Sequence, residues 1–455
     1  MALENLFSTL EGPSFVRVRG RVRRVVGLIV EAEGLRLPIG SVCRIESDLG
    51  GGMSLESAAS LEAEVVGFKE GRTLLIPCGS TEGISPGDAV VASGEKLRVQ
   101  VSEKLLGRVL NGHGVPIDGG PPIHWEATQP IDGVPVPPLE RKRITEPFST
   151  GVRAIDGALT VGTGQRMGIF AGSGVGKSVL RGMLAQHSEA PINVIALIGE
   201  RGREVREFLE RDLGPEGLAR SVVIVATSDE PPVLRLRAAR VATSIAEWFR
   251  DRGEDVLFML DSITRVALAQ REVGLSAFEP PTTKAYPPSV FALLAKLLER
   301  TGPGVNGSIT GFYTVLVEAD DLNDPIGDAV RGILDGHIWL SRRMANRREF
   351  PAIDLLESVS RVMKDVCSDD HKALAEELLA DIALFRDVED LIQLGAYVRG
   401  SDPKTDRAVE RMPKIREILG QTSDDPTPLG ETATRLTELY RKSKPMPAAQ
   451  ARRMT

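Results

Sequence analysis

The chain has 455 residues, of which 42% are hydrophobic and 26% are charged, proportions typical of a globular protein with room for roughly three domains. Its net charge of −7 disfavours a general nucleic-acid binder, and its three distant cysteines (Cys43, Cys78 and Cys367) indicate neither a disulfide framework nor a zinc site. No stretch approaches the ~18 apolar residues of a membrane span, and the first residues lack the charged segment of a signal peptide. We therefore expect a cytoplasmic protein that reaches a membrane only through partners or its surface.

Residues 1–14 are expected to include a short helix ahead of the first domain. Apolar side chains at Leu3, Leu6, Phe7 and Leu10 follow the spacing of one helix face. A helix this short is not stable alone in water, so it suits docking to another protein. The alternative is that it folds back on its own first domain.

The segment 15–92 is predicted to form a small β-barrel or sandwich. Its apolar and polar residues alternate over short runs that glycine interrupts, as in Phe15–Val22 and Leu61–Phe68. Such period-two alternation, with turn residues at short regular intervals, is typical of these two folds.

Two further regions follow this first domain. Between residues 93 and 366, apolar strands alternate with helices, which is the pattern of a parallel α/β sheet covered on both faces. Residues 367–455 show helical spacing without strand patterns, and a basic tail begins near Lys444. The sequence therefore predicts a β domain, an α/β core and a helical C-terminal domain.

The segment 169–178 has the composition of a phosphate-binding loop between a strand at 167–170 and a helix at 179–186. Its glycines allow successive N–H groups to turn towards a phosphate at the positive end of the helix, although Ala171 replaces the usual first glycine. Lys177 is expected to reach the β- and γ-phosphates, and the Ser178 hydroxyl to bind Mg²⁺. The expected nucleotide-binding residues are Gly172, Ser173, Gly174, Val175, Gly176, Lys177, Ser178 and Val179.

Asp261 follows the apolar run Val256–Leu260, which predicts a central strand. Its carboxylate should therefore lie at the carboxyl edge of the sheet, beside the phosphate loop. We expect Asp261 to hold Mg²⁺ through the water shell of the ion, because Mg²⁺ dehydrates reluctantly. Taken alone, an aspartate in this position is as often a turn residue.

Glu200 ends another apolar strand, Val194–Ile198, after Gly199. Phosphoryl transfer to water requires a group that orients and polarises the attacking water, and Glu200 is predicted to be that group. The alternative is a charged cap on the following helix. Arg201 or Arg203 is expected either to contact phosphate or to pair with Glu204.

These elements resemble the α and β subunits of rotary ATP synthases and the ATPases of type III secretion. The segment 351–361 is similar to the signature that those proteins share, and segments 107–118 and 316–325 match them as well. The resemblance extends from residue 15 to 420. It implies a RecA-like P-loop core with an N-terminal β-barrel and a C-terminal helical domain.

Within this family, segments 152–178, 285–291 and 307–316 are most similar to the flagellum-specific export ATPases. The injectisome ATPases of pathogenicity secretion are the nearest alternative. The synthase β subunit carries a run of acids where its central stalk pushes, whereas residues 395–406 of this chain lack such a run. The tyrosine that packs on adenine in that subunit falls at Lys372, so no residue is assigned to adenine stacking.

The resemblance implies a homohexamer that binds ATP and Mg²⁺ at its subunit clefts. It also implies an arginine supplied by the neighbouring subunit, and Arg361 is the matching position; an ion pair within the subunit is the alternative. A guanidinium placed there stabilises negative charge on the transferring phosphoryl group, which raises the rate by ~10³ or more. The implied catalytic residues are Glu200, Lys177, Arg361 and Arg201, with Ser178 and Asp261 at the metal.

The implied partners follow from the same resemblance. A stator-like regulator would bind residues 1–14, and a stalk-like protein would occupy the central pore, which the loop 274–288 would face. Export substrates and their chaperones would be the cargo. The expected location is the cytoplasmic face of the inner membrane, with peripheral attachment through the export gate.

Two other classes of function are alternatives. A RecA-like hexameric RNA helicase requires basic and aromatic residues on its barrel. The predicted barrel segment 15–92 has arginines at positions 17, 19, 21, 23 and 24, but its only aromatic residues are Phe15 and Phe68. A catalytically silent structural subunit is disfavoured because such subunits lack the carboxylate at the position of Glu200.

Overall fold

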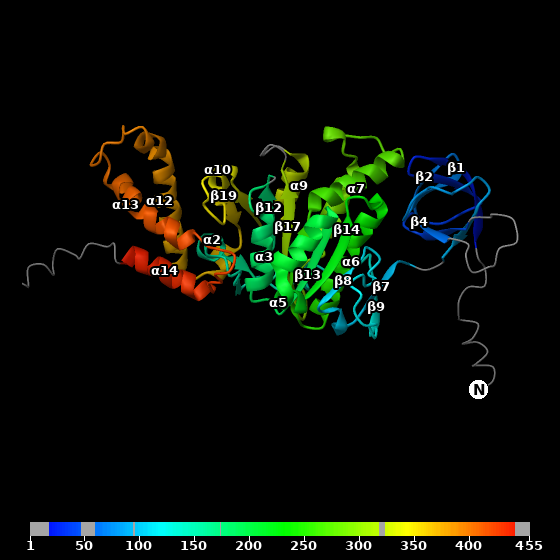
Figure 1. The fold of residues 1–455 in the computed structure, drawn as a ribbon, viewed down its shortest axis with the longest axis horizontal. Helices are drawn as coiled ribbons and strands as arrows, with labels where there is room; N and C mark the ends of the chain where they lie inside the picture. Colours follow the sequence, from blue (N-terminus) through cyan, green and yellow to red (C-terminus); the bar gives the residue numbers. More distant parts are fainter. Residues whose placement is uncertain (1–17, 47–59, 94–95, 173, 318–323, 442–455) are drawn as a thin grey trace, which may run out of the picture.

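The computed structural model describes residues 18–46, 60–93, 96–172, 174–317 and 324–441. These residues form three parts along one axis, with a β-barrel at one end, an α/β sheet in the middle and a group of helices at the other end (Figure 1). This is the order and class of parts that the sequence predicts. The predicted helix within residues 1–14 and the basic tail from Lys444 lie outside the described residues.

The N-terminal part is a closed barrel of six antiparallel strands in the order β1-β2-β5-β4-β3-β6. Its interior is apolar, with Val22, Val30, Ile45, Val65 and Leu75 among the buried side chains. The strand β1 alternates exposed and buried residues over its first five positions, as a strand with one face on the core must. The strands are β1 (Arg19–Val26), β2 (Ile29–Glu33), β3 (Val42–Glu46), β4 (Ser60–Lys69), β5 (Arg72–Pro77) and β6 (Ala89–Ala92).

The central part is a nine-stranded sheet in the order β19-β18-β12-β17-β15-β13-β14-β8, with β16 paired to β17 beside this path. Its pairs are parallel, except that β19 and β16 run antiparallel to their neighbours. The strands are β8 (Arg108–Leu110), β12 (Arg166–Ala171), β13 (Ile192–Glu200), β14 (Ser221–Thr227), β15 (Asp255–Asp261), β16 (Gly302–Pro303), β17 (Ser308–Leu316), β18 (Gly336–Leu340) and β19 (Ile353–Ser360). Two small sheets join β7 (Arg98–Val101) to β9 (Ala127–Pro130) and β10 (Pro147–Phe148) to β11 (Val161–Gly162).

Helices cover both faces of the sheet, which explains its continuous apolar strands. In β13, Val194, Ala196 and Ile198 enter one core cluster, whereas Ile195 and Leu197 enter the other. The first cluster includes side chains from α6 (Pro232–Asp251), α7 (Ile263–Ser276), α8 (Pro288–Leu298) and α9 (Pro325–Ile333). The second includes side chains from α2 (Arg153–Ala158), α3 (Lys177–His187) and the π-helical turn η2 (Phe208–Leu213).

Helix η2 lies between α4 (Gly202–Glu207) and α5 (Gly214–Ala219), and short helices lie at η1 (Glu103–Leu105), η3 (Thr283–Ala285), α10 (Arg342–Asn346) and α11 (Met363–Val366). The C-terminal part consists of α12 (Asp369–Gln393), α13 (Pro403–Leu419) and α14 (Leu429–Arg441). None of the described helices combines the length and the apolar composition that a membrane span requires.

Arg153 joins the C-terminal helices to the central part. Its side chain is almost fully buried, and its Nε donates to the carbonyl of Ile418 at 2.6 Å. Its Nη1 donates to Thr427 at 2.9 Å and pairs with Asp425 at 2.6 Å. The backbone N–H of Arg153 donates to Gln421 at 2.8 Å. One guanidinium therefore supports the turn that follows α13.

Replacing Arg153 with alanine should loosen this junction. Arg153→Ala removes several charge-assisted hydrogen bonds and leaves the Ile418 carbonyl without this donor. The free energy of unfolding should therefore fall by about 2–4 kcal/mol. Urea denaturation followed by far-UV circular dichroism should show an earlier transition. The control is Arg435→Ala, which removes only a surface pair with Glu431 on α14 and should cost no more than about 0.5 kcal/mol. Equal midpoints for the two variants would contradict the assigned role of Arg153.

Candidate functional site

The phosphate loop joins the end of β12 to the start of α3, as the sequence predicts. Gly174 and Gly176 have φ values of 75° and 94°, a left-handed conformation that favours glycine. Lys177 is the first residue of α3, directly after Gly176 at the helix N-cap. Ser173 lies outside the described residues. The loop therefore presents backbone N–H groups and the positive end of α3 to one point at the carboxyl edge of the sheet.

Lys177 lies between the two predicted carboxylates. Its Nζ is 2.9 Å from Oδ1 of Asp261 and 3.4 Å from Oε1 of Glu200. The other carboxylate oxygen of Asp261 pairs with Arg181, one helical turn further along α3. The structure thus brings together three residues that the sequence predicts for one site. Arg181 is an addition that the sequence did not indicate.

Asp261 is held as a carboxylate by its two cations. It is only 1% exposed, and burial by itself raises the pKa of a carboxyl group. The charges of Arg181 and Lys177 outweigh this effect and hold the pKa of Asp261 below its usual range. Both of its oxygens are engaged, so a cation near Asp261 would be contacted most readily through water.

The pKa of Glu200 is shifted in the opposite direction, upwards. Burial, followed by repulsion from the charge of Asp261, raises the pKa of Glu200 to about 7. A hydrogen bond with Glu204 further favours the neutral form of Glu200, and the same bond lowers the pKa of Glu204. Glu200 is therefore a carboxyl group that changes its charge near neutral pH, where a general base is most effective.

Among the described residues, Arg201 and Arg203 form their ion pairs with acids of α4. The Arg201 side chain is 76% exposed and pairs with Glu204 at 3.1 Å, which was one of the two predicted arrangements. Arg203 pairs with Glu207 at 3.7 Å on the surface of α4. In this conformation the cations beside the carboxylates are Lys177 and Arg181.

Arg361 lies at the opposite edge of the sheet from the phosphate loop. The preceding residue, Ser360, is paired with Gly336, which is paired with Met167 near the start of β12. The phosphate loop follows Ala171 at the other end of that strand, four residues or about 13 Å further along the sheet. Among the described residues Arg361 forms no ion pair; its exposed guanidinium donates to the carbonyl of Arg331 at 3.4 Å.

A pocket of about 520 Å³ lies beside the phosphate loop. One wall is the apolar side of α3 and another is the segment 348–352, with residues 420–423 closing it. A Cβ placed on Gly176 would lie 3.6 Å from the ring of Phe350, so this ring lies against the phosphate loop. Lys372, which occupies the position of the adenine-packing tyrosine of the synthase β subunit, does not line this pocket.

Phe350 was not predicted as a site residue, because the sequence alone does not show that residues 348–352 lie against α3. The only signal was its position directly before the family signature at Pro351.

The residues present fit a Mg²⁺ ion that is held mainly by phosphate and water. The described residues contain no group of three or more histidine, cysteine, aspartate or glutamate side chains that could enclose a metal. Ser178 is exposed at the start of α3, and the residue before it, Lys177, contacts Asp261. One hydroxyl with one carboxylate is the donor set expected for Mg²⁺ that arrives with a nucleotide.

Comparisons with known proteins agree with this geometry. The nucleotide-binding domain of the ATP synthase alpha/beta family matches residues 151–360, and the β-barrel domain of that family matches residues 22–94. The C-terminal domain of the T3SS EscN ATPase matches residues 367–438.

Individual relatives match over nearly the whole chain. The flagellum-specific ATP synthase of Bacillus subtilis is 50% identical, over 96% of this chain and 99% of its own. The type 3 secretion system ATPase of Xanthomonas euvesicatoria is 49% identical, over 92% of this chain and 93% of its own.

Solved structures give the same result. The assembled ATPase EscN from the type III secretion system of enteropathogenic E. coli superimposes with a TM-score of 0.87 at 43% identity, over 92% of this chain and 99% of its own. EscN in complex with its central stalk EscO gives a TM-score of 0.84 at 42% identity, with the same coverage. This chain therefore belongs to the ATP synthase alpha/beta family and is an ATP-hydrolysing relative of the flagellum-specific and type 3 secretion ATPases.

Proposed function

We propose that the chain is the ATPase of a flagellar type III protein export apparatus, and that it works as a homohexameric ring at the cytoplasmic face of the inner membrane. Several relatives of flagellar description, from three bacteria, are 48–50% identical to it. An injectisome ATPase is the second candidate, because relatives from type 3 secretion are almost as similar. We assign residues 15–92, 93–366 and 367–455 to its three domains.

Within one subunit, Lys177 and the N–H groups of residues 172–179 are proposed to bind the phosphates of ATP. The ammonium of Lys177 would exchange its contacts with Asp261 and Glu200 for phosphate oxygens. Mg²⁺, held by Ser178 and through water by Asp261, would neutralise charge on the phosphates. Glu200, once freed from Lys177, would orient the attacking water and accept its proton. The pocket beside Phe350 would receive the adenine.

The position of Arg361 carries the proposal of a ring. An arginine at the far edge of the sheet lies too far from the phosphate loop to reach the phosphates of its own subunit, so we propose that it acts on those of a neighbour. Arg201 is proposed as an auxiliary cation that leaves Glu204 when ATP is bound. Hydrolysis is then coupled to assembly, since each site is completed by the next subunit.

The proposed partners extend this scheme. A stalk-like protein would occupy the pore of the ring, as the relative solved with its central stalk supports. The predicted loop 274–288, of which residues 277–287 lie between α7 and α8, would face it; there, the centre of the Phe278 ring lies 3.5 Å from the Lys69 ammonium of the barrel. Residues 1–14 would bind a stator-like regulator, and export substrates with their chaperones would be the cargo. No nucleic acid is required.

Genetic complementation tests the cellular role. Deleting the gene should abolish swimming and flagellar filaments, and the wild-type gene should restore both, whereas Glu200→Gln should not. Normal flagella in the deletion strain, together with loss of injectisome secretion, would favour the second candidate.

The pH profile of hydrolysis tests the role of Glu200. Its pKa is raised to about 7, so its carboxylate form prevails above that pH, and kcat/KM should fall up to tenfold for each pH unit below it. Glu204→Gln removes the charged acceptor that favours neutral Glu200 and supplies an amide N–H that can donate to ionised Glu200. The pKa of Glu200 should therefore fall, and the acid limb should move to lower pH. Glu207→Gln, which changes only an exposed pair with Arg203, should leave the limb in place. Glu200→Gln should bind ATP without turnover; normal turnover would remove Glu200 from its role.

Mixing two inactive variants tests whether Arg361 acts in trans. Arg361→Ala should retain ATP affinity within about twofold but lose ~10³ in turnover. When it is mixed equally with Glu200→Gln, random assembly pairs an intact Glu200 with an intact neighbouring Arg361 in about a quarter of the interfaces. Turnover should therefore reappear on mixing. If the mixture stays as inactive as its components, Arg361 does not act across the interface. Lys364→Ala, an exposed residue on α11, is the control and should keep normal turnover.

Comparing two ligands tests the adenine pocket. Phe350→Ala removes the ring that lies against Gly176, so ATP should bind about tenfold more weakly, whereas inorganic tripolyphosphate should bind as it does to the wild type. Isothermal titration calorimetry measures both. Phe68→Ala, on the exposed surface of the barrel, is the matched control. An equal loss for both ligands would show that Phe350 supports the phosphate loop instead of the base.

A further inference from the structure

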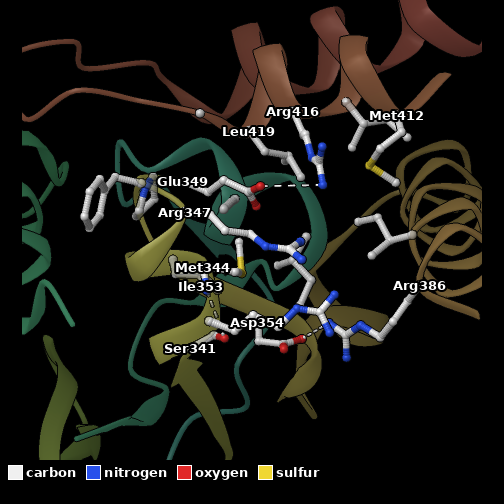
Figure 2. Close-up of a pocket in the computed structure, with 18 of the residues that line it drawn as sticks. Ser341, Met344, Arg347, Glu349, Ile353, Asp354, Arg386, Met412, Arg416 and Leu419 are labelled. Carbon is white, nitrogen blue, oxygen red and sulfur yellow. Dashed lines mark hydrogen bonds and ion pairs between the residues drawn. The ribbon is translucent and has the colours of Figure 1, made fainter. Parts of the chain in front are cut away.

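A second cavity, of about 400 Å³, lies between the sheet and the C-terminal helices (Figure 2). It is formed by α10 and β19 on one side and by α12 and α13 on the other. Its volume is within the range of small-molecule sites, which begins at roughly 300 Å³. None of the residues proposed to bind phosphate, Mg²⁺ or the attacking water lines it.

The charged wall of this cavity carries excess positive charge. Five arginines and three carboxylates line it, which leaves two positive charges in excess. Glu389 is 8% exposed and accepts from both Arg343 and Arg347, with Arg416 at 3.4 Å. Burial raises the pKa of a carboxyl group, but these guanidinium groups outweigh that effect and hold the pKa of Glu389 below its usual range, so its charge is present.

One carboxylate cannot use all the donors around it. A carboxylate has about four lone-pair sites, whereas each guanidinium has five N–H donors. The side chains of Arg343, Arg347 and Arg416 also remain partly exposed. In Figure 2 the guanidinium of Arg347 extends into the space between Arg416 and Arg386, which pair with Glu349 and Asp354. Donors thus remain for an additional anion.

The remaining wall of the cavity is apolar. Met412 and Leu419 project from α13 and Met344 from α10 (Figure 2), and Ile382 and Phe385 line it from α12. Methionine side chains adapt to ligands of different shape, because they are unbranched and polarisable. An apolar wall facing a group of guanidiniums suits a ligand that has an apolar body and an anionic end.

The cavity shares a wall with the adenine pocket. Arg348, Phe350, Pro351 and Gly420 line both spaces. Arg348 has a φ of 62°, a left-handed conformation that is unfavourable for a residue other than glycine. A ligand that pushes on this segment therefore acts on a strained stretch of backbone that also contacts the phosphate loop.

We propose that this cavity is an allosteric site for a small amphipathic anion, a molecule with an apolar body and one carboxylate, sulfonate or phosphate group. The anion pairs with Arg347 and its neighbouring arginines, and the apolar body packs on Met344 and Met412. Occupancy displaces the shared segment 348–351 towards the adenine pocket and weakens nucleotide binding.

The probe is 8-anilinonaphthalene-1-sulfonate, which joins aromatic rings to one sulfonate and fluoresces when its rings are shielded from water. Titration into the full chain should give a saturable signal with one site per chain. Arg347→Ala should weaken the probe at least fivefold, while Glu389 keeps Arg343 and Arg416 as partners. Met344→Trp, which fills the apolar side, should also weaken it. Arg407→Ala, which lies on α13 outside the cavity, should bind like the wild type.

Titration with ADP separates an allosteric site from competition. Saturating probe should weaken ADP binding by a finite factor of at least three, and saturating ADP should weaken the probe by the same factor, since coupling is reciprocal. Complete displacement of the probe by ADP, or unchanged probe affinity in Arg347→Ala and Met344→Trp, would overturn the proposal. The coupling rests on the proposed nucleotide site, whereas binding of the probe alone does not, so the two can fail separately.

Discussion

The charge balance at Asp261 is the interaction on which the nucleotide site depends. A buried carboxylate without a partner is strongly destabilising, and Asp261 finds its partners in Lys177 and Arg181. These contacts tie the end of β15 to the phosphate loop and to the first turns of α3. The same cations keep Asp261 ionised, and its charge then contributes to raising the pKa of Glu200. Two carboxylates that both contact Lys177 thereby acquire different pKa values, which suits Asp261 to binding a metal and Glu200 to accepting a proton.

Sheet topology decides which chemistry a single subunit can perform. The parallel strands β12, β13 and β15 end at the same edge, so Lys177, Glu200 and Asp261 meet there. The strand β19 runs the other way and delivers Arg361 to the opposite edge. The reversed direction of one edge strand thus separates the two halves of the proposed site, and the proposed ring would bring them together.

The C-terminal helices are connected to nucleotide binding at two places. Arg153 anchors the turn after α13 to the start of α2, close in sequence to the phosphate-loop strand. The segment 348–351 lies between the proposed adenine pocket and the arginine-lined cavity and contributes residues to both. A movement of α13 would therefore change the walls of the proposed adenine pocket as well as those of the cavity, because packed side chains transmit displacement with little compression.

The sequence by itself determined the class of fold and the phosphate loop. Period-two alternation, continuous apolar strands and helical spacing are local patterns, and the loop 172–179 is a contiguous segment whose chemistry is readable residue by residue. The carboxylates Glu200 and Asp261 were predictable as well, because each ends an apolar strand. Tertiary structure alone decided that Arg181 shares Asp261, that Phe350 lies against Gly176, and that five arginines surround one cavity. These contacts join residues whose separation in the chain carries no periodic signal, so they exist only once the sheet order and the packing of α12 and α13 place them together.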